Sequence, residues 1–128
     1  MPTLFSRIIS WEIPAYTIYE DEYTYAFLDI FPHKLGHTLI VPKCEVDYFV
    51  DVPEPYYSAI FQTAKKLAPM LQAATGCKRV CTMFVGYEVP HAHYHLIPTD
   101  SIVDIHTTAS RASPEELQMM QKNILAYM

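Results

Sequence analysis

The sequence predicts an α+β fold, in which a mainly antiparallel five-stranded sheet is combined with one long and two short helices. Two observations predict this fold class. Five short segments rich in aromatic and β-branched residues have the length and composition of strands. Three other segments carry apolar residues at helical spacing. Because no repeat or Gly/Ser-rich linker interrupts the 128 residues, we expect one domain over residues 1–128.

The first helix is expected over residues 4–9, where four apolar residues recur at helical spacing, and it should end before Pro14. Two strands are expected next, over residues 16–20 and 23–29. The turn-forming pair Asp21-Glu22 separates them, which predicts a β-hairpin.

A third strand is expected over residues 36–42, which begin with a glycine and end with a proline. The long helix is expected between Pro53 and Gly76, because the apolar residues there follow the pattern of one buried helix face. Pro69 lies inside this pattern, and we expect it to kink the helix or to break it near Ala68.

The last third of the chain predicts two more strands and one more helix. Residues 79–85 and 92–98 have strand composition and are expected to pair with each other. The final helix is expected over residues 114–127, with Ser113 as its N-cap and acidic residues in its first turn.

The composition excludes several classes of protein. Hydrophobic residues make up 51% of the chain, enough for a core, so a disordered or low-complexity chain is excluded. Nine Lys and Arg against fourteen Asp and Glu give a formal charge of -5, which argues against a nucleic-acid polymer or an anionic membrane surface as partner. A net charge of -5 is still compatible with binding one small phosphate group, because histidine and backbone N–H groups can hold a single anion.

The three cysteines, Cys44, Cys77 and Cys81, contain no Cys-x-x-Cys pair and predict neither a disulfide framework nor a Cys-rich zinc site. We expect them to be reduced thiols. No stretch of the sequence has the length and hydrophobicity of an export signal or a membrane span. These observations favour a cytoplasmic location without a membrane partner.

The segment His91-Ala92-His93-Tyr94-His95 is the part of the sequence that most clearly indicates a functional site. In a strand, alternate residues face the same side, so the three imidazoles should line up with about 6.5 Å between neighbouring Cα atoms. The residues between them should face the opposite, buried side. Burying three polar rings in a row would require several hydrogen-bonding partners at once, so a purely structural role is disfavoured.

Two chemistries suit such a row. Alternate histidines can bind a metal ion, although Glu88 and Asp100, the nearest acids, form no familiar ligand pattern with them. Alternatively, one neutral histidine attacks phosphorus while its neighbours orient it and move protons. His37, at the start of the third strand, is a candidate fourth polar group for that second chemistry.

Residues 91–98 resemble the His-x-His-x-His motif of the histidine triad (HIT) superfamily of nucleotide hydrolases and transferases. Three more segments are similar to the family in the same order: residues 4–14, 26–30 and 36–43. The likeness covers nearly the whole chain and is greatest to the Hint-like bacterial branch. The resemblance implies a HIT-like fold and a homodimer with a sheet that continues across the interface.

For function, the resemblance implies cleavage of a P–N or P–O bond at the α-phosphorus of a purine nucleotide derivative, such as a nucleoside phosphoramidate. His93 would attack phosphorus and form a covalent nucleotidyl-histidine. His91 and His37 would orient that ring, and His95 would contact a phosphoryl oxygen and assist the leaving group. Asp29 would accept hydrogen bonds from the ribose hydroxyls. The residues implied to bind the nucleotide are Leu4, Phe5, Ile8, Phe27, Leu28, Asp29 and Ile30.

The sequence also departs from the family pattern. Many bacterial relatives have a Cys-x-x-Cys pair where this chain has Thr3 and Ser6, so we expect no structural zinc. Where many Hint-like relatives place a Gln and a Ser shortly before the triad, this chain has the stretch Gly86-Tyr87-Glu88-Val89-Pro90. A glutamate would repel a phosphate, so either Glu88 faces away or the leaving group differs. The asparagine that relatives often have at the end of the fourth strand is also missing.

The preferred hypothesis is an enzyme that needs no metal and no cofactor. Three alternatives stay open: a dinucleoside polyphosphate hydrolase, a metal-dependent enzyme with the three triad histidines as ligands, and a nucleotide-binding protein without catalysis. His33 and His106 are interpreted as loop residues outside the chemistry.

Overall fold

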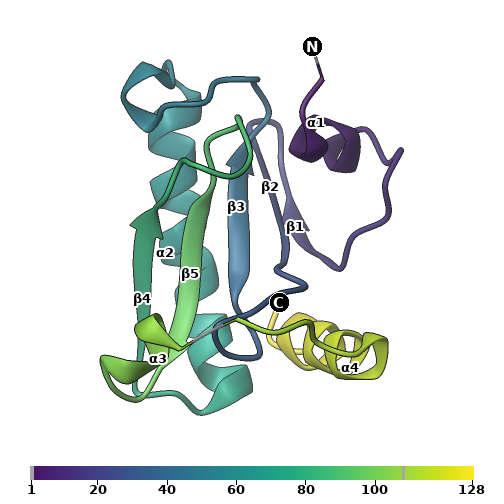
Figure 1. Ribbon diagram of the computed structural model, residues 1–128, viewed down its shortest axis with the longest axis vertical. Coiled ribbons are helices and arrows are strands. Elements are labelled where there is room, and N and C mark those ends of the chain that lie inside the picture. Colours follow the sequence, from purple (N-terminus) through teal and green to yellow (C-terminus); the bar gives the residue numbers. More distant parts are fainter. Residues whose placement is uncertain (1, 108) are drawn as a thin grey trace.

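The computed structural model describes residues 2–107 and 109–128, which form one five-stranded antiparallel sheet with helices packed around it (Figure 1). The strands lie in the order β1-β2-β3-β5-β4. They are β1 (Thr17–Glu20), β2 (Thr24–Leu28), β3 (Thr38–Pro42), β4 (Arg79–Phe84) and β5 (Tyr94–Thr99). The helices are α1 (Leu4–Ile9), the 3-10 turn η1 (Phe49–Asp51), α2 (Tyr56–Thr75), α3 (Val103–His106) and α4 (Pro114–Leu125). The predicted fold class is confirmed.

Each face of the sheet carries its own core, because side chains alternate along the strands. Ala26, Leu28 and Ile40 face α2, which runs behind the sheet in Figure 1. Their neighbours Phe27 and Leu39 face the other way and pack with residues of α1. The second face is covered by this short helix and by loop residues, among them Ile13, Ala15 and Val89, and the candidate site lies there.

The two edge strands of the sheet, β1 and β4, have different neighbours. β1 lies against α4, where the Gln121 side-chain amide donates to the carbonyl of Thr17 at 2.9 Å. β4 forms the other edge, and among residues 2–107 and 109–128 its one strand partner is β5. An edge strand has unpaired backbone N–H and C=O groups, which suit it to pairing with another chain.

Most predicted elements are present, and three details differ. α2 continues through Pro69, so the predicted break near Ala68 is wrong. Pro69 and Lys65, the residue whose carbonyl loses its helical hydrogen bond, are both exposed, so water can reach that carbonyl. The short elements η1 and α3 were not expected. In the described part of the chain, no helix combines the length and hydrophobicity needed to cross a membrane.

The third difference concerns the triad segment. β5 begins only at Tyr94, so His91 and His93 precede the strand, and the expected row of three histidines along one strand is wrong. The N–H of His91 donates to the carbonyl of Val89 at 2.8 Å, which makes a tight turn that a strand cannot contain. The N–H of Ala92 donates to Val46 at 2.6 Å instead of to a strand of the sheet.

Candidate active site

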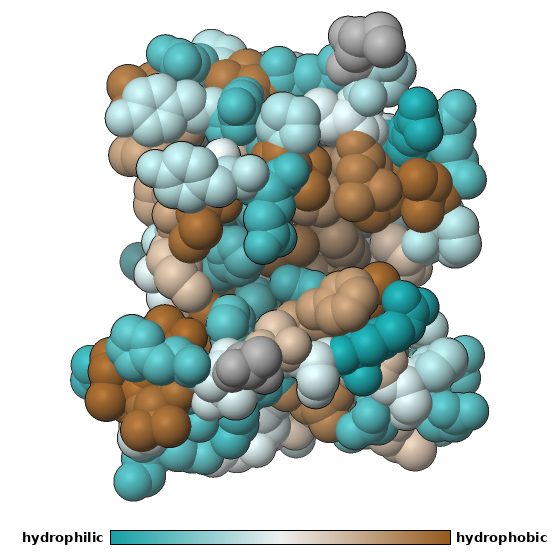
Figure 2. All heavy atoms as spheres, viewed as in Figure 1, coloured by the Kyte–Doolittle hydropathy of each residue, from teal (hydrophilic) through white to brown (hydrophobic). Residues whose placement is uncertain are grey.

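A cavity of about 270 Å³ opens on the face of the sheet that carries α1. Figure 2 shows this face, with apolar atoms at the floor of a hollow. All seven residues predicted to bind the nucleotide line it, together with His93 and His95. The remaining lining residues were not predicted: Ile13, Pro14, Ala15, Phe31, Leu39, Glu88 and Val89.

The strands place the floor of the cavity. Phe27 pairs with Leu39 across β2 and β3, and Leu39 pairs with His95 across β3 and β5. These three side chains therefore share one face of the sheet. Phe5 of α1 lies against this row, with its ring centroid 5.6 Å from that of Phe27 and 5.0 Å from that of His93. An apolar wall thus leads directly to the histidines.

His91 does not line the cavity but is fully buried behind it. Its Nε2 donates to the carbonyl of Pro42 at 2.9 Å. Its Nδ1 is therefore the acceptor nitrogen, and it accepts from the Thr3 hydroxyl at 2.8 Å. Burial lowers the pKa of His91, which keeps the ring neutral.

Thr3 connects α1 to the triad. Its Oγ1 caps the helix by accepting from the N–H of Ser6 at 3.0 Å, and the Ser6 hydroxyl accepts in return from the N–H of Thr3 at 2.8 Å. The two residues that stand in place of a Cys-x-x-Cys pair thus form a capping box. The Thr3 hydroxyl also fixes the orientation of His91.

His93 is held by the backbone of the same segment. Its Nδ1 lies 2.8 Å from the carbonyl of His91, and a carbonyl only accepts, so Nδ1 carries the proton. In the neutral ring, Nε2 then has a free lone pair. The nitrogen that faces the cavity is therefore a nucleophile or a metal ligand, not a donor.

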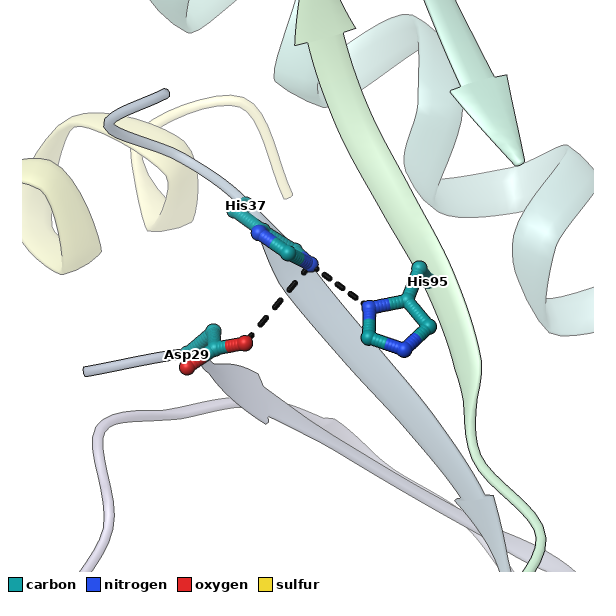
Figure 3. A group of neighbouring side chains, drawn as sticks. All are labelled: Asp29, His37 and His95. Atoms are coloured by element: carbon teal, nitrogen blue, oxygen red, sulfur yellow. Dashed lines mark hydrogen bonds and ion pairs between the residues drawn. The ribbon is translucent and has the colours of Figure 1, made fainter. Parts of the chain in front are cut away.

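His37 and His95 form a second linked pair (Figure 3). The backbone N–H of His33 donates to Nδ1 of His37 at 3.1 Å, so the proton of the neutral His37 ring is on Nε2. That Nε2–H donates to Nδ1 of His95 at 2.8 Å. The neutral His95 ring therefore carries its proton on Nε2, a buried atom that has no hydrogen-bond partner among the described residues.

Burial holds both rings neutral. It lowers the pKa of His37 to about 3, with smaller contributions from neighbouring histidines, and lowers the pKa of His95 to about 4. Nε2 of His37 lies 3.7 Å from a carboxylate oxygen of Asp29. Because the ring is neutral, the two groups do not form an ion pair at neutral pH. The unpartnered N–H of His95 is left to meet an acceptor that enters the cavity.

Asp29 follows directly after β2, at the edge of the cavity. One of its oxygens accepts from the N–H of Phe31 at 2.8 Å, and this bond orients the carboxylate. Burial raises the pKa of Asp29, and the charge of Glu88 adds a smaller contribution in the same direction. The group is placed as an acceptor beside the apolar wall.

The geometry contradicts the alternative in which all three triad histidines bind a metal ion. Both nitrogens of His91 are occupied by Pro42 and Thr3, and Nδ1 of His93 is occupied by a carbonyl. The described residues whose ligand atoms cluster within 4.8 Å are instead Asp29, His37 and His95. A cation there would have to replace the proton shared by the two histidines.

The departures from the family pattern gather around His93. Glu88 does not face away, because it lines the same cavity as His93 and His95. A second cavity of about 400 Å³ is lined by Ala92 and His93. It is also lined by Phe84, the last residue of β4, the strand end at which the asparagine of many relatives is absent from this chain. The other lining residues are Asp47, Tyr48, Phe49, Val85, Gly86 and Tyr87.

The sequence did not indicate the roles of Thr3 and His33. Interpreting His33 as a solvated loop residue was wrong, because its ring stacks on that of His37 at 5.4 Å and its N–H sets the proton position of that ring. The proximity of His33 to His37, on the turn before a strand, was the available signal. Thr3 meets His91 across 88 positions of sequence, and no local pattern predicts such a contact.

Comparisons with known proteins agree with this geometry. The family model of the HIT domain matches residues 10–102. Adenosine 5′-monophosphoramidase HNT1 of Saccharomyces cerevisiae is 33% identical over 127 residues, covering 96% of this chain and 80% of the yeast protein. A HIT-like protein of Methanocaldococcus jannaschii is 39% identical over 99 residues, covering 74% of this chain and 77% of that protein. The crystal structure of a Hit-like protein from Bartonella henselae has a TM-score of 0.87 at 27% identity, covering 98% of this chain and 96% of the Bartonella chain.

Proposed function

Because the chain belongs to the HIT family, we propose that it is a nucleotide hydrolase or nucleotidyl transferase acting on nucleoside phosphoramidates at the α-phosphorus. The reaction proceeds through a nucleotidyl group bound covalently to His93. The name of the yeast relative, an adenosine 5′-monophosphoramidase, supports a purine nucleotide and a P–N bond. We assign residues 1–128 to one HIT-like nucleotide-binding domain.

One observation carries this proposal. His93 presents a lone pair on Nε2 and His95 presents an N–H on Nε2, and both residues line the same cavity. A nucleophile and a hydrogen-bond donor to the phosphoryl oxygen are the two groups that attack at phosphorus requires. Neither ring has to change its tautomer before reaction.

The nucleoside occupies the apolar part of the cavity. The base lies between the side chains of α1 and those of β2, among them Phe5 and Phe27. Asp29 accepts hydrogen bonds from the ribose hydroxyls, because its carboxylate is an acceptor at the edge of the apolar wall. The α-phosphorus then lies beside Nε2 of His93.

In the first step, the Nε2 lone pair of His93 forms a bond to phosphorus, the P–N bond of the substrate breaks, and the protonated nitrogen leaves as an amine. The ring of His93 becomes positively charged, and the carbonyl of His91 stabilises it through the bond at Nδ1. In the second step, water attacks phosphorus, the bond to Nε2 breaks, and a nucleoside monophosphate and a proton are released.

The covalent intermediate provides the test. The enzyme is mixed with less than one equivalent of adenosine 5′-phosphoramidate, quenched in alkali on the millisecond scale, and digested for mass spectrometry. We expect an adenylyl group on the peptide that contains His93, and no adduct or turnover in His93→Ala or His93→Asn. Full activity of either variant, or nucleotide binding without an adduct or turnover in the wild type, would contradict the proposal.

We also propose a homodimer that forms through β4. This strand is the edge that pairs only with β5, whereas α4 lies against the opposite edge. An antiparallel pairing of two β4 strands about a two-fold axis would continue the sheet across the interface. Light scattering should give twice the mass of one chain at micromolar concentration, and a monomer mass would contradict this.

The partner expected in the cell is therefore a small purine nucleotide, with neither a nucleic-acid polymer nor a membrane. The cytoplasmic location stays a prediction, based on three cysteines that are free thiols. Fractionation of cells that carry a tagged chain would test it.

A further inference from the structure

The end of α3 and the chain that leads from it to α4 lie along the turn before β3, residues 30–34. We call the described residues of this segment, 104–107 and 109–112, the strap; Figure 1 shows it running from α3 toward α4. Three contacts connect the strap to the turn: Lys34 with Asp104, His33 with Thr107, and Ile30 with Ala112. The residue numbers rise along the strap as they fall along the turn, so the two segments lie side by side in antiparallel directions.

The central contact is made by the ring of His33. Its Nδ1 lies 2.7 Å from the carbonyl oxygen of Thr107, and a carbonyl only accepts, so Nδ1 carries the proton of the neutral ring and is the donor. The contact of Lys34 is weaker, because its two atoms are 3.8 Å apart and the lysine side chain is 41% exposed. The strap therefore holds the ring of His33 mainly through one backbone carbonyl.

The face of the same ring contacts the histidine pair. The rings of His33 and His37 are stacked, with centroids 5.4 Å apart and 22° between their planes. The backbone N–H of His33 donates to Nδ1 of His37 at 3.1 Å, near the upper end of the usual range for such a bond. His33 thus contacts the strap with the edge of its ring, and contacts His37 with both its ring face and its backbone.

The bond to Thr107 also affects the backbone of His33. Loop segments move more than strands, and a hydrogen bond of 3.1 Å is easily lost when its donor shifts. Because the ring and the N–H belong to one residue, a ring that is fixed between Thr107 and His37 also keeps the N–H directed at Nδ1 of His37. Anchoring of this kind is how surrounding residues keep a functional group in place.

We propose that the strap belongs to the active site, because the carbonyl of Thr107 positions His33 and thereby the proton on Nε2 of His95. Hydrogen bonds of 2.7, 3.1 and 2.8 Å connect these groups in series, with His37 as the third member. His33 is a positioning residue, since it lines neither cavity and acts through His37. Its effect on turnover rests on the proposed function, whereas its effect on the position of the proton does not.

Two substitutions at His33 separate the bond to Thr107 from the stacking on His37. His33→Asn keeps a side-chain N–H close to the position of Nδ1 and removes the aromatic ring. His33→Phe keeps a ring for the stacking and removes the donor. The backbone N–H of residue 33 is present in both variants, so a difference between them reports the bond to Thr107.

The first measurement needs no substrate. Long-range ¹H–¹⁵N correlation spectra at pH 8.5, where an ordinary imidazole is neutral, show which nitrogen of each ring carries the proton and whether each variant is folded. We expect the proton of His33 on Nδ1 in the wild type. We expect the proton of His95 on Nε2 in the wild type and in His33→Asn, and both tautomers of His95 in His33→Phe. A proton on Nε2 of His33, or an unchanged His95 in His33→Phe, would overturn the proposal.

The second measurement is steady-state turnover of adenosine 5′-phosphoramidate. We expect kcat to fall by about fivefold in His33→Phe at an unchanged KM, the usual effect of one neutral hydrogen bond, and to stay near the wild-type value in His33→Asn. His106→Phe and His106→Asn, at an exposed histidine of α3, are the matched controls and should keep the wild-type kcat. Equal values of kcat in His33→Phe and His33→Asn would overturn the role of the Thr107 carbonyl.

The two measurements distinguish failure of this proposal from failure of the proposed function. If the wild-type chain turns over its substrate but the tautomer of His95 is the same in His33→Phe, the strap has no positioning role and the mechanism at His93 stands. If the wild-type chain neither turns over nor forms an adduct, the proposed function fails, and the spectra still decide whether the strap positions the proton of His95.

Discussion

Two pairs of histidines meet at the candidate site, and opposite kinds of backbone group hold them. In the His91–His93 pair, carbonyl groups accept from the rings, so the protons point into the protein. In the His37–His95 pair, a backbone N–H donates to the first ring, so each ring carries its proton on Nε2. The first pair ends in a lone pair, and the second pair ends in an N–H.

This difference shows how histidine rings in one site can have opposite roles. The tautomer of a histidine is set by the partner of its other nitrogen. The carbonyl of His91, one hydrogen bond from His93, leaves a lone pair on Nε2 of that ring, and the N–H of His33, two hydrogen bonds from His95, leaves an N–H on Nε2 of the other. Burial supports this arrangement at His37 and His95, because it lowers the pKa of both rings and keeps them neutral.

After the complete loss of turnover expected in the His93 variants, the largest effect is expected at His95, the donor end of the His37–His95 pair. His95→Ala removes the buried N–H that has no partner among the described residues, and we expect kcat to fall by about 10²- to 10³-fold, the usual cost of losing one donor to a developing negative charge. Steady-state kinetics with adenosine 5′-phosphoramidate measures this. His106→Ala, at an exposed histidine of α3, is the control and should retain wild-type kcat. A loss of less than threefold in His95→Ala would exclude the donor role.

A smaller effect is expected one hydrogen bond further back, at His37. His37→Leu leaves Nδ1 of His95 without a donor, so His95 can take either tautomer, and kcat should fall by about tenfold. His37→Gln keeps an N–H in this position and should recover part of the activity. If Leu and Gln have the same effect, His37 fills space and does not position the proton of His95.

The first pair can be tested at Thr3, where the effect is expected mainly on stability. Thr3→Val removes both the helix cap and the donor to the buried Nδ1 of His91, which should lower the free energy of unfolding by about 1–3 kcal/mol. Urea denaturation measures this loss. Thr3→Ser keeps the hydroxyl and is the matched variant. Equal losses in Val and Ser would show that the hydroxyl contributes nothing.

The pH dependence of stability tests whether the His37–His95 pair is neutral in the folded chain. Because the pKa values of His37 and His95 are about 3 and 4 in the native state, the unfolded chain binds more protons than the native chain below about pH 6.5. Their contribution is fully present above that pH and is lost as the pH falls toward 4, by at most about 1.4 kcal/mol per pH unit and histidine. His37→Leu should flatten this slope, and an identical slope would contradict the neutral cluster.

Much of the fold was predictable, because it depends on local patterns. Aromatic and β-branched composition indicated the strands, and Ser113 marked the start of α4. The boundaries failed where the backbone has partners outside the local pattern. The N–H of Ala92 bonds to Val46, far along the chain, and this delays the start of β5.

The candidate site was predictable as a set of residues but not as an arrangement. The motif and its resemblance indicated His93 and Asp29, and both line the cavity. The position of each proton depends on Pro42, Thr3 and His33, whose contacts with the histidines form only in the folded chain. The same limit applied to Glu88, whose side chain could face either way until the loop before the triad was placed.

The tautomers themselves test the account most directly. Long-range ¹H–¹⁵N correlation spectra of the uniformly labelled chain at pH 7.5 report which nitrogen of each neutral ring carries the proton. We predict that His93 has its proton on Nδ1 and His95 has its proton on Nε2. A proton on Nε2 of His93, or on Nδ1 of His95, would contradict the account, because the cavity would then lack either its nucleophile or its donor.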